Sequence, residues 1–255
     1  MTSDASAVYV YGVGAAAELG PVAAAGVQDV TVLRVEHGDL VALASELKDG
    51  ALAAAREVRA HWRVLDEASQ GATVLPTRFG TVMESEQAVR DGLLAPHADR
   101  LRELLRGLAG RVQLNVKGDY DEDKILSQVV AASPAILALR DKLRTLPEAA
   151  GYYERIRLGE LVADEVERRR AADTERALAT LRGFAAEARQ EQSSQPYNAY
   201  KLAFLVERDH QDAFSAAVDQ LATEQADTIA IRYVGPLPPY SFAEAELTPE
   251  AQAWA

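Results

Sequence analysis

The stretch Val30-Thr-Val-Leu-Arg-Val-Glu-His-Gly-Asp-Leu-Val-Ala-Leu-Ala44 predicts the kind of sheet on which this chain is built. Residues 30–35 and 40–44 are two apolar runs that have the pattern of strands. Between them lies Glu36-His-Gly-Asp39, which has the composition of a tight turn. We therefore expect these two strands to form an antiparallel hairpin.

The segments on either side of this hairpin alternate between strand and helix patterns. Residues 7–11 read as a strand, and residues 51–69 read as a helix with an apolar face formed by Val58, Trp62, Leu65 and Ala68. The remaining elements of the first half are a strand at 72–77, helices at 84–94 and 96–108, and a strand at 111–117. This order is close to that of a ferredoxin-like α+β sandwich, with helices over one face of an antiparallel sheet. We therefore expect a ferredoxin-like N-terminal domain at residues 1–118.

The second half is dominated by helix patterns. A helical stretch at residues 148–192 would extend about 65 Å if it were continuous, and a bend at residues 171–173 is an equal alternative. The other predicted elements are helices at 121–132, 134–143 and 210–224, and strands at 199–206 and 228–234. The strand at 199–206, the helix at 210–224 and the strand at 228–234 form either a βαβ-like unit or a tight antiparallel pair. Residues 119–255 are thus expected to form a helix-rich α+β C-terminal domain.

A proline-rich arm follows the last predicted strand. Gly235 permits a turn, and the next residues contain three prolines that fix φ and lack N–H donors: Pro236, Pro238 and Pro239. Neither a helix nor a central strand can continue through them, so a stiff, extended arm is predicted. We expect its aromatic residues, Tyr240 and Phe242, to pack back onto the body of this chain.

Composition argues against several classes of protein. A net charge of −12 is unfavourable for nonspecific nucleic-acid binding, which needs Lys and Arg to neutralise phosphates. The chain has no apolar run of about 18 residues, and its polar start lacks a secretory pattern, so we expect neither a membrane span nor a signal peptide. The absence of cysteine excludes disulfides and thiolate chemistry, and it suits a cytoplasmic location.

One pattern points to an enzyme. Gly12-Val-Gly14-Ala-Ala-Ala17 matches a dinucleotide-binding turn, and Glu36 stands where a ribose-binding acid could lie. Such a turn holds a pyrophosphate at a helix N-terminus, but Gly20, Pro21 and Gly26 leave little room for that helix. The strand ending at Glu36 also enters a hairpin, whereas a parallel nucleotide-binding sheet would continue into another helix. An enzyme that uses this turn for a nucleotide cofactor is therefore the alternative interpretation, and we expect no cofactor.

Other polar groups fit structural roles. Asp119-Tyr-Asp-Glu-Asp123 could hold a divalent cation, but it lacks the calcium-loop pattern, so we expect its acids to cap the next helix. The four histidines are scattered without metal-ligand spacing. No nucleophile, base and orienting group come together in the sequence. We therefore predict neither catalytic residues nor a metal site.

A second unusual segment is Leu75-Pro-Thr-Arg-Phe-Gly-Thr81. Its structural interpretation is an ordered turn in which Arg78 caps carbonyls, Phe79 fills the core and Gly80 allows the bend. Its functional interpretation is a recognition edge. We take Arg78 and Phe79 as candidate partner-binding residues, with Pro76 and Gly80 as structural residues of the motif.

Together these segments resemble the gas vesicle protein F/L family (GvpF/GvpL). The resemblance covers nearly the whole chain through Val8-Tyr-Val-Tyr-Gly12, His61 with Val64-Leu65, Val74–Thr81, Val112–Lys117, Ala199-Tyr200 with Leu202, and Gly235–Phe242. Its specific elements are Pro76-Thr-Arg-Phe-Gly-Thr81 and Gly235-Pro-Leu-Pro-Pro-Tyr-Ser-Phe242. The sequence departs from the family at Leu237, where members often have Trp, and near Leu114, where they have an aromatic residue.

The resemblance implies a non-enzymatic accessory or minor structural protein that acts in gas vesicle formation. It implies contact with the hydrophobic, GvpA-like shell protein and with other accessory proteins, and it brings no catalytic or cofactor residues. We hypothesise that residues 1–118 provide the shell-binding surface, by strand addition near Pro76 beside Arg78 and Phe79. A scaffold that uses the long helix as a coiled coil is a third class, which the lack of sustained heptads disfavours.

Overall fold

The computed structural model describes residues 6–48, 52, 55–147 and 151–243. Contacts between Cα atoms divide the chain into two units. The first contains the residues up to Gln113 together with those from Gly235 onward, and the second contains Leu114–Val234. This grouping places the proline-rich arm with the N-terminal unit. The domain limits at residues 118 and 119 stay a prediction.

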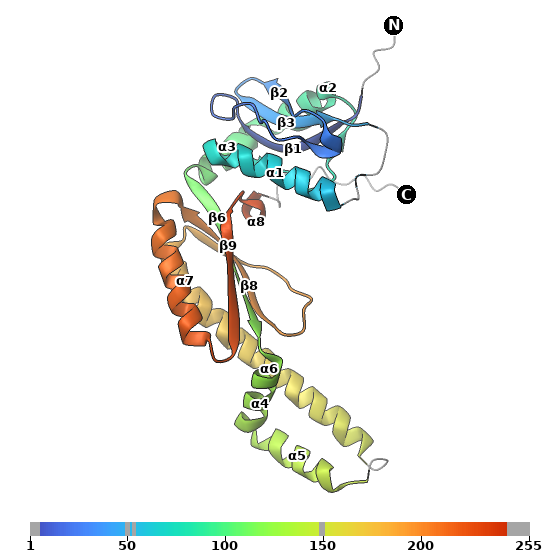
Figure 1. The fold of residues 1–255 in the computed structure, drawn as a ribbon, viewed down its shortest axis with the longest axis vertical. Coiled ribbons are helices and arrows are strands. Elements are labelled where there is room, and N and C mark those ends of the chain that lie inside the picture. Colours follow the sequence, from blue (N-terminus) through green and yellow to red (C-terminus); the bar gives the residue numbers. More distant parts are fainter. Residues whose placement is uncertain (1–5, 49–51, 53–54, 148–150, 244–255) are drawn as a thin grey trace. The chain divides into compact units, whose positions relative to one another are not determined.

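The first unit is built on an antiparallel sheet, as the sequence predicts. Its strand order is β2 (Leu33–His37), β3 (Leu40–Glu46), β1 (Val8–Ala15) and β4 (Val74–Pro76), and β5 (Val82–Met83) also pairs with β1. The predicted hairpin is confirmed, since β2 and β3 pair antiparallel from Leu33↔Ala44 to His37↔Leu40. The helical segments of this unit are η1 (Val27–Asp29), α1 (Ala55–Gly71), α2 (Glu86–Ala88), η2 (Val89–Leu94), α3 (Ala98–Leu108) and α8 (Tyr240–Ala243) (Figure 1).

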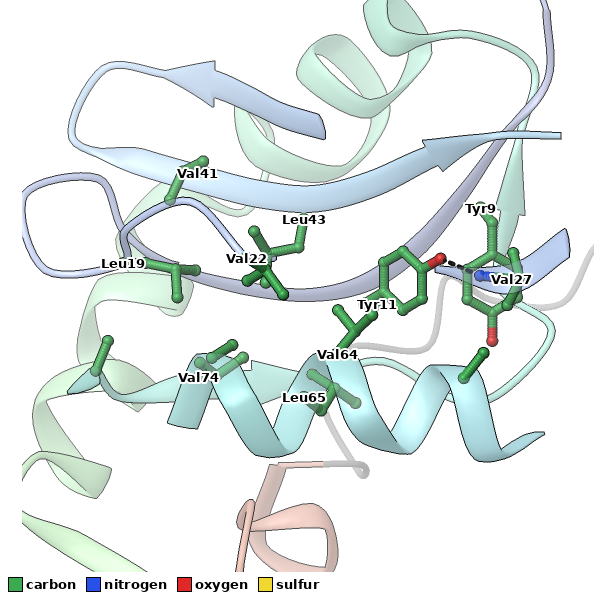
Figure 2. Packing of buried hydrophobic residues seen from close by; sticks show 13 residues of the cluster. Tyr9, Tyr11, Leu19, Val22, Val27, Val41, Leu43, Val64, Leu65 and Val74 are labelled. Carbon is green, nitrogen blue, oxygen red and sulfur yellow. Dashed lines mark hydrogen bonds between the residues drawn. The ribbon is translucent and has the colours of Figure 1, made fainter. Parts of the chain in front are cut away.

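The core of this unit lies between β1, β3 and α1. Figure 2 shows Tyr11 from β1, Leu43 from β3, and Val64 and Leu65 from α1 packed in one cluster. The hydroxyl of Tyr11 accepts a hydrogen bond from the backbone N–H of Val27 at 2.7 Å, so the buried phenol also fixes the loop before β2. Burial of the phenol raises the pKa of Tyr11, which keeps it protonated.

The apolar face of α1 differs from the predicted one. The buried residues of α1 are Glu57, Ala60, His61, Val64, Leu65 and Ala68. Trp62 is 41% exposed, and Val58 is half-buried. Leu65 and Ala68 of the predicted face are buried as expected, but His61 is buried where the pattern placed Trp62.

The second unit contains a four-stranded sheet in the order β7 (Glu187–Gln190), β8 (Asn198–Glu207), β6 (Arg111–Tyr120) and β9 (Ile229–Leu237). The placement of residues 111–117 in the first sheet is therefore wrong, since β6 pairs in the second one. β6 also separates β8 from β9, so the alternative of a tight antiparallel pair is wrong. The helical segments here are α4 (Glu122–Ala132), α5 (Pro134–Thr145), α6 (Tyr152–Leu181), η4 (Arg182–Phe184), η5 (Arg208–His210) and α7 (Gln211–Gln225) (Figure 1).

The long predicted helix is continuous but shorter than its pattern. α6 has 30 residues and runs through residues 171–173 as one helix. Extending it to residue 192 is wrong, because the chain leaves the helix around Gly183, a weak helix former, and enters β7. β7 pairs with β8 from Glu187↔Leu205 to Gln190↔Leu202, so hydrogen bonds to the sheet replace the helix. Within the described ranges, no helix has the length and apolar character needed to cross a membrane.

Candidate partner-binding site

The glycines of the dinucleotide-like pattern lie inside a strand. Gly12 and Gly14 belong to β1, where Gly12 pairs with Leu43 and Pro76, and Gly14 pairs with Val41 and Val74. A Cβ on Gly12 would lie 2.7 Å from the Leu75 carbonyl oxygen. The glycines therefore allow close packing within the sheet. The cofactor interpretation required a loop that opens onto a helix N-terminus, and this segment does not form one.

An aromatic cluster instead marks this unit. It combines side chains from β1, from α1, from the loop after β4 and from α8: Tyr9, Tyr11, His61, Trp62, Phe79 and Tyr240. His61 stands at its centre and is 1% exposed. The ring centroids of His61 and Phe79 are 5.8 Å apart, and those of Trp62 and Tyr240 are 4.4 Å apart. Such edge and tilted contacts are the favourable geometries for aromatic rings.

His61 connects two tyrosine hydroxyls. Its Nδ1 lies 2.9 Å from Tyr9 Oη, and its Nε2 lies 3.2 Å from Tyr240 Oη. The neutral imidazole has one donor and one acceptor, so it satisfies both partners. Burial lowers the pKa of His61 to about 4, because the charged ring would lose its hydration. His61 is thus a neutral structural link, in agreement with the structural role expected for the histidines.

The Pro76–Thr81 motif forms an ordered turn beside this cluster. Pro76 ends β4 and pairs with Gly12. The Arg78 carbonyl accepts from the Thr81 N–H at 3.1 Å, and Gly80 has φ +91°, which side chains strongly disfavour. The Gly80 N–H donates to Tyr9 Oη at 3.1 Å, which ties the turn to the cluster. Gly80 therefore sets the position of Phe79.

The proline-rich arm is extended through Leu237, as predicted, but Tyr240–Ala243 forms a short helix, so the prediction of an extended arm is wrong at its end. β9 continues through Gly235 and Pro236 to Leu237, which the sheet permits because β9 is an edge strand. The Pro239 carbonyl then accepts from the N–H of Phe242 at 3.0 Å and opens the short helix α8. Phe242 is buried, and Tyr240 packs on Trp62 as described above.

α8 is also held through the residue that follows Tyr240. The Ser241 N–H donates to Gln113 Oε1 at 2.8 Å, and Gln113 Nε2 donates to Ser241 Oγ at 2.9 Å. The arm thus packs on this chain, as its aromatic residues predicted. The two specific motifs of the sequence, which lie far apart along the chain, meet at His61.

Three large apolar side chains of this unit reach solvent at the cluster. Trp62 is 41%, Phe79 is 37% and Val82 is 43% exposed. Val82 pairs with Tyr9 across β1 and β5, so it belongs to the same region as the two aromatic residues. We call Trp62, Phe79 and Val82 the aromatic surface. Arg78, the other candidate partner-binding residue, is exposed next to Phe79.

The acidic segment of the second unit has structural partners. Asp121 caps α4 by accepting from the Lys124 N–H at 3.1 Å, as predicted. Asp119 accepts from Asn198 at 3.1 Å and pairs with Lys117 and Arg232. Within the described residues, no group of three or more His, Cys, Asp or Glu is arranged to hold a metal ion.

Part of this region was predictable from the sequence. The motif at residues 76–81 suggests an edge with Arg78 and Phe79, and the C-terminal arm suggests a packed Tyr240, but no local pattern joins Tyr9, His61 and Trp62 to them. The available signal was the run His61-Trp62 on a helix next to an alternating Tyr9-Val-Tyr11 strand. Local patterns do not specify which aromatic residues meet in space.

The chain matches the family model described as "Gas vesicle synthesis protein GvpL/GvpF" over residues 7–244. It is 37% identical over 212 residues to Gas vesicle protein F of Streptomyces sp. (strain CB03234), covering 82% of this chain and 86% of that protein. Gas vesicle protein F of Nostoc sp. is 28% identical over 195 residues, with coverage of 76% and 79%.

Solved structures agree with these sequence matches. The crystal structure of GvpF from Anabaena sp. matches with a TM-score of 0.80 at 26% identity, covering 94% of this chain and 99% of that chain. GvpF from Microcystis aeruginosa matches with a TM-score of 0.76 at 25% identity, covering 93% and 99%. The α+β architecture is therefore shared along almost the full length of both proteins.

Proposed function

Since the chain belongs to the GvpL/GvpF family of gas vesicle synthesis proteins, we propose that it binds the hydrophobic shell protein during vesicle assembly. Membership of the family gives it an assembly-related role in gas vesicles. Beyond this role, we propose that the partner is the shell protein and that the aromatic surface contacts it. In this role the chain acts by binding and carries out no chemical reaction.

The observation that carries the proposal is the aromatic surface. Trp62, Phe79 and Val82 expose large apolar area, yet Trp62 and Phe79 contact the buried His61, and Val82 pairs with the buried Tyr9. Phe79 contacts Tyr9 and His61 with ring centroids 6.0 and 5.8 Å apart. Exposed aromatic residues on a rigid frame are typical of the centres of protein interfaces, because little side-chain entropy is lost on binding.

Side-chain contact fits this surface better than strand addition at β4. Val74 and Leu75 of β4 are 1% and 0% exposed. α8 and α3 lie against this strand. Pairing with an added strand requires an accessible edge, which β4 does not offer. We therefore place the contact on Trp62 and Phe79, with Arg78 at the rim.

Replacing the exposed rings tests this assignment in the full-length chain. Phe79→Ser and Trp62→Ser should each lower the retention of purified shell protein on the immobilised chain by about tenfold, the usual range for a central interface residue. Phe184→Ser is the matched control, because Phe184 is 39% exposed on the second unit. Its retention should equal the wild-type level.

Two results would count against the proposal. One is equal retention by wild type, Phe79→Ser and Trp62→Ser. The other is loss of retention in Phe184→Ser alone, which would move the surface to the second unit. Circular dichroism of each variant separates loss of binding from loss of folding.

A further inference from the structure

The hairpin of α5 and the first half of α6 buries few side chains. All buried residues of α6 lie from Asp173 onward, so Tyr152–Ala172 has none. The buried residue of α5 is Ile136. Figure 1 shows α5 beside the N-terminal half of α6, away from the sheet of the second unit. The exposed part of α6 is about 30 Å long, which is enough for a helix–helix interface.

A hollow of about 630 Å³ lies between these two helices. Its apolar lining comes from Ala135, Ala138 and Leu139 of α5 and from Leu161 of α6. Tyr153 and Arg157, which precede Leu161 by eight and four residues, line it from the same face of α6. Two adjacent helices, one of which presents small residues such as alanine, form a groove between them that fits a third helix.

The charges on this face of α6 are incompletely paired. Lys142 pairs with Glu154 at 3.1 Å across the hairpin, and Arg168 pairs with Glu165. The side chains of Arg157 and Asp164 have no hydrogen bond or ion pair within the described part of the chain. They lie seven residues apart, about 10 Å along one face of the helix, with Leu161 between them. The face thus carries one free positive and one free negative charge.

We propose that this groove binds the same groove of a second copy of this chain, with the two α6 helices antiparallel. An antiparallel pairing centred between Glu160 and Leu161 places Arg157 opposite Asp164 of the second copy. The two-fold symmetry repeats the pair, so both free charges on each copy are matched. The same register places Tyr153 opposite Arg168, where a cation can stack on the ring.

One neighbouring register is disfavoured. A shift of the centre by two residues toward the C-terminus would bring Arg157 opposite Arg168, which is unfavourable. Each α6 would lie in the groove of the other copy, over Ala135 and Ala138, and the two hairpins would form a four-helix bundle. The inference is independent of the aromatic surface, which lies on the first unit.

Charge reversal tests the pairing in the full-length chain. Sedimentation equilibrium of the wild type should give twice the 27.5 kDa mass of one chain. Arg157→Asp or Asp164→Arg alone converts two attractive pairs into two like-charge pairs, so the dimer Kd should rise about tenfold or more at low salt. The double variant R157D/D164R restores opposite charges and should return the Kd to within about threefold of wild type.

Controls make each outcome decisive. Arg144→Asp changes an exposed charge of α5 that does not line the hollow, and it should leave the Kd unchanged. A wild type that stays monomeric at all concentrations overturns the proposal, whether or not it binds another protein or a lipid vesicle. The proposal is also overturned if the dimer Kd is unchanged in both single charge-reversal variants, or if the double variant does not restore it.

Discussion

β1 and α6 are stabilised in opposite ways. The first seven residues of β1, Val8–Gly14, are all buried, although the strand is only 8 residues long. α6 has 30 residues and buries five of them, all in its last third. β1 therefore depends on the packing around it, whereas the first part of α6 depends on its own hydrogen bonds and on α4 and α5.

This difference separates two kinds of binding surface. Trp62 and Phe79 reach solvent from a frame in which Tyr9 and His61 are buried and hydrogen bonded. Arg157 and Asp164 lie on the part of α6 that has no buried residue. A substitution beneath the aromatic surface should therefore alter both stability and shape. A substitution on the hairpin should alter recognition and leave folding nearly unchanged.

The largest expected contrast is between two aliphatic truncations. Leu65→Ala empties a fully buried position of α1 and should lower the free energy of unfolding by about 3 kcal/mol. Ile156→Ala removes a side chain that is 45% exposed on α6, and the change should stay within about 0.5 kcal/mol. Urea unfolding followed by circular dichroism measures both. Equal losses would mean that the hairpin is packed like the core.

The second contrast concerns pH and His61. The pKa of His61 is about 4 in the folded chain against 6.5 for the free side chain, so folding favours the neutral ring. The resulting stability is complete above pH 6.5 and is lost as the pH falls from 6.5 toward 4. Between pH 7 and pH 5 the loss should be about 2 kcal/mol.

His61→Gln keeps a donor and an acceptor but cannot titrate in this range. The unfolding free energy of this variant should be lower at pH 7, and it should change less than that of wild type between pH 7 and pH 5. The difference between the two curves isolates the imidazole from the carboxylates that titrate at lower pH. Parallel curves would show that His61 is not desolvated as the structure indicates.

Local patterns predicted most elements of the fold. The hairpin at residues 30–44 was predictable because alternation and a Gly-containing turn are properties of a short segment. The assignment of residues 111–117 to the first sheet failed for a different reason. An alternating pattern predicts that a segment forms a strand, but it does not predict which strands lie beside it. The neighbours of β6 are β8 and β9, which lie far along the chain.

The same limit applies to the candidate site. Gly80 and Phe79 stand out in sequence because a turn needs glycine at positive φ. His61 was predicted only as a structural or surface residue, and its two tyrosine partners come from positions 9 and 240. A buried imidazole needs partners for both nitrogens, but the sequence does not say which hydroxyls supply them.

The smallest single changes are expected at two glycines and have opposite signs. An alanine at Gly12 in β1 would place its Cβ 2.7 Å from the Leu75 carbonyl oxygen and 2.9 Å from Val74 Cγ1, so the sheet must move. Gly12→Ala should lower the unfolding free energy by about 1 to 2 kcal/mol. Gly159 in α6 has no atom within 4 Å of the added Cβ, and Gly159→Ala should raise it by about 0.5 to 1 kcal/mol because glycine weakens a helix. Thermal unfolding of both variants measures the two signs. If Gly12→Ala left stability unchanged, the close approach of β4 to β1 would not require a glycine at this position.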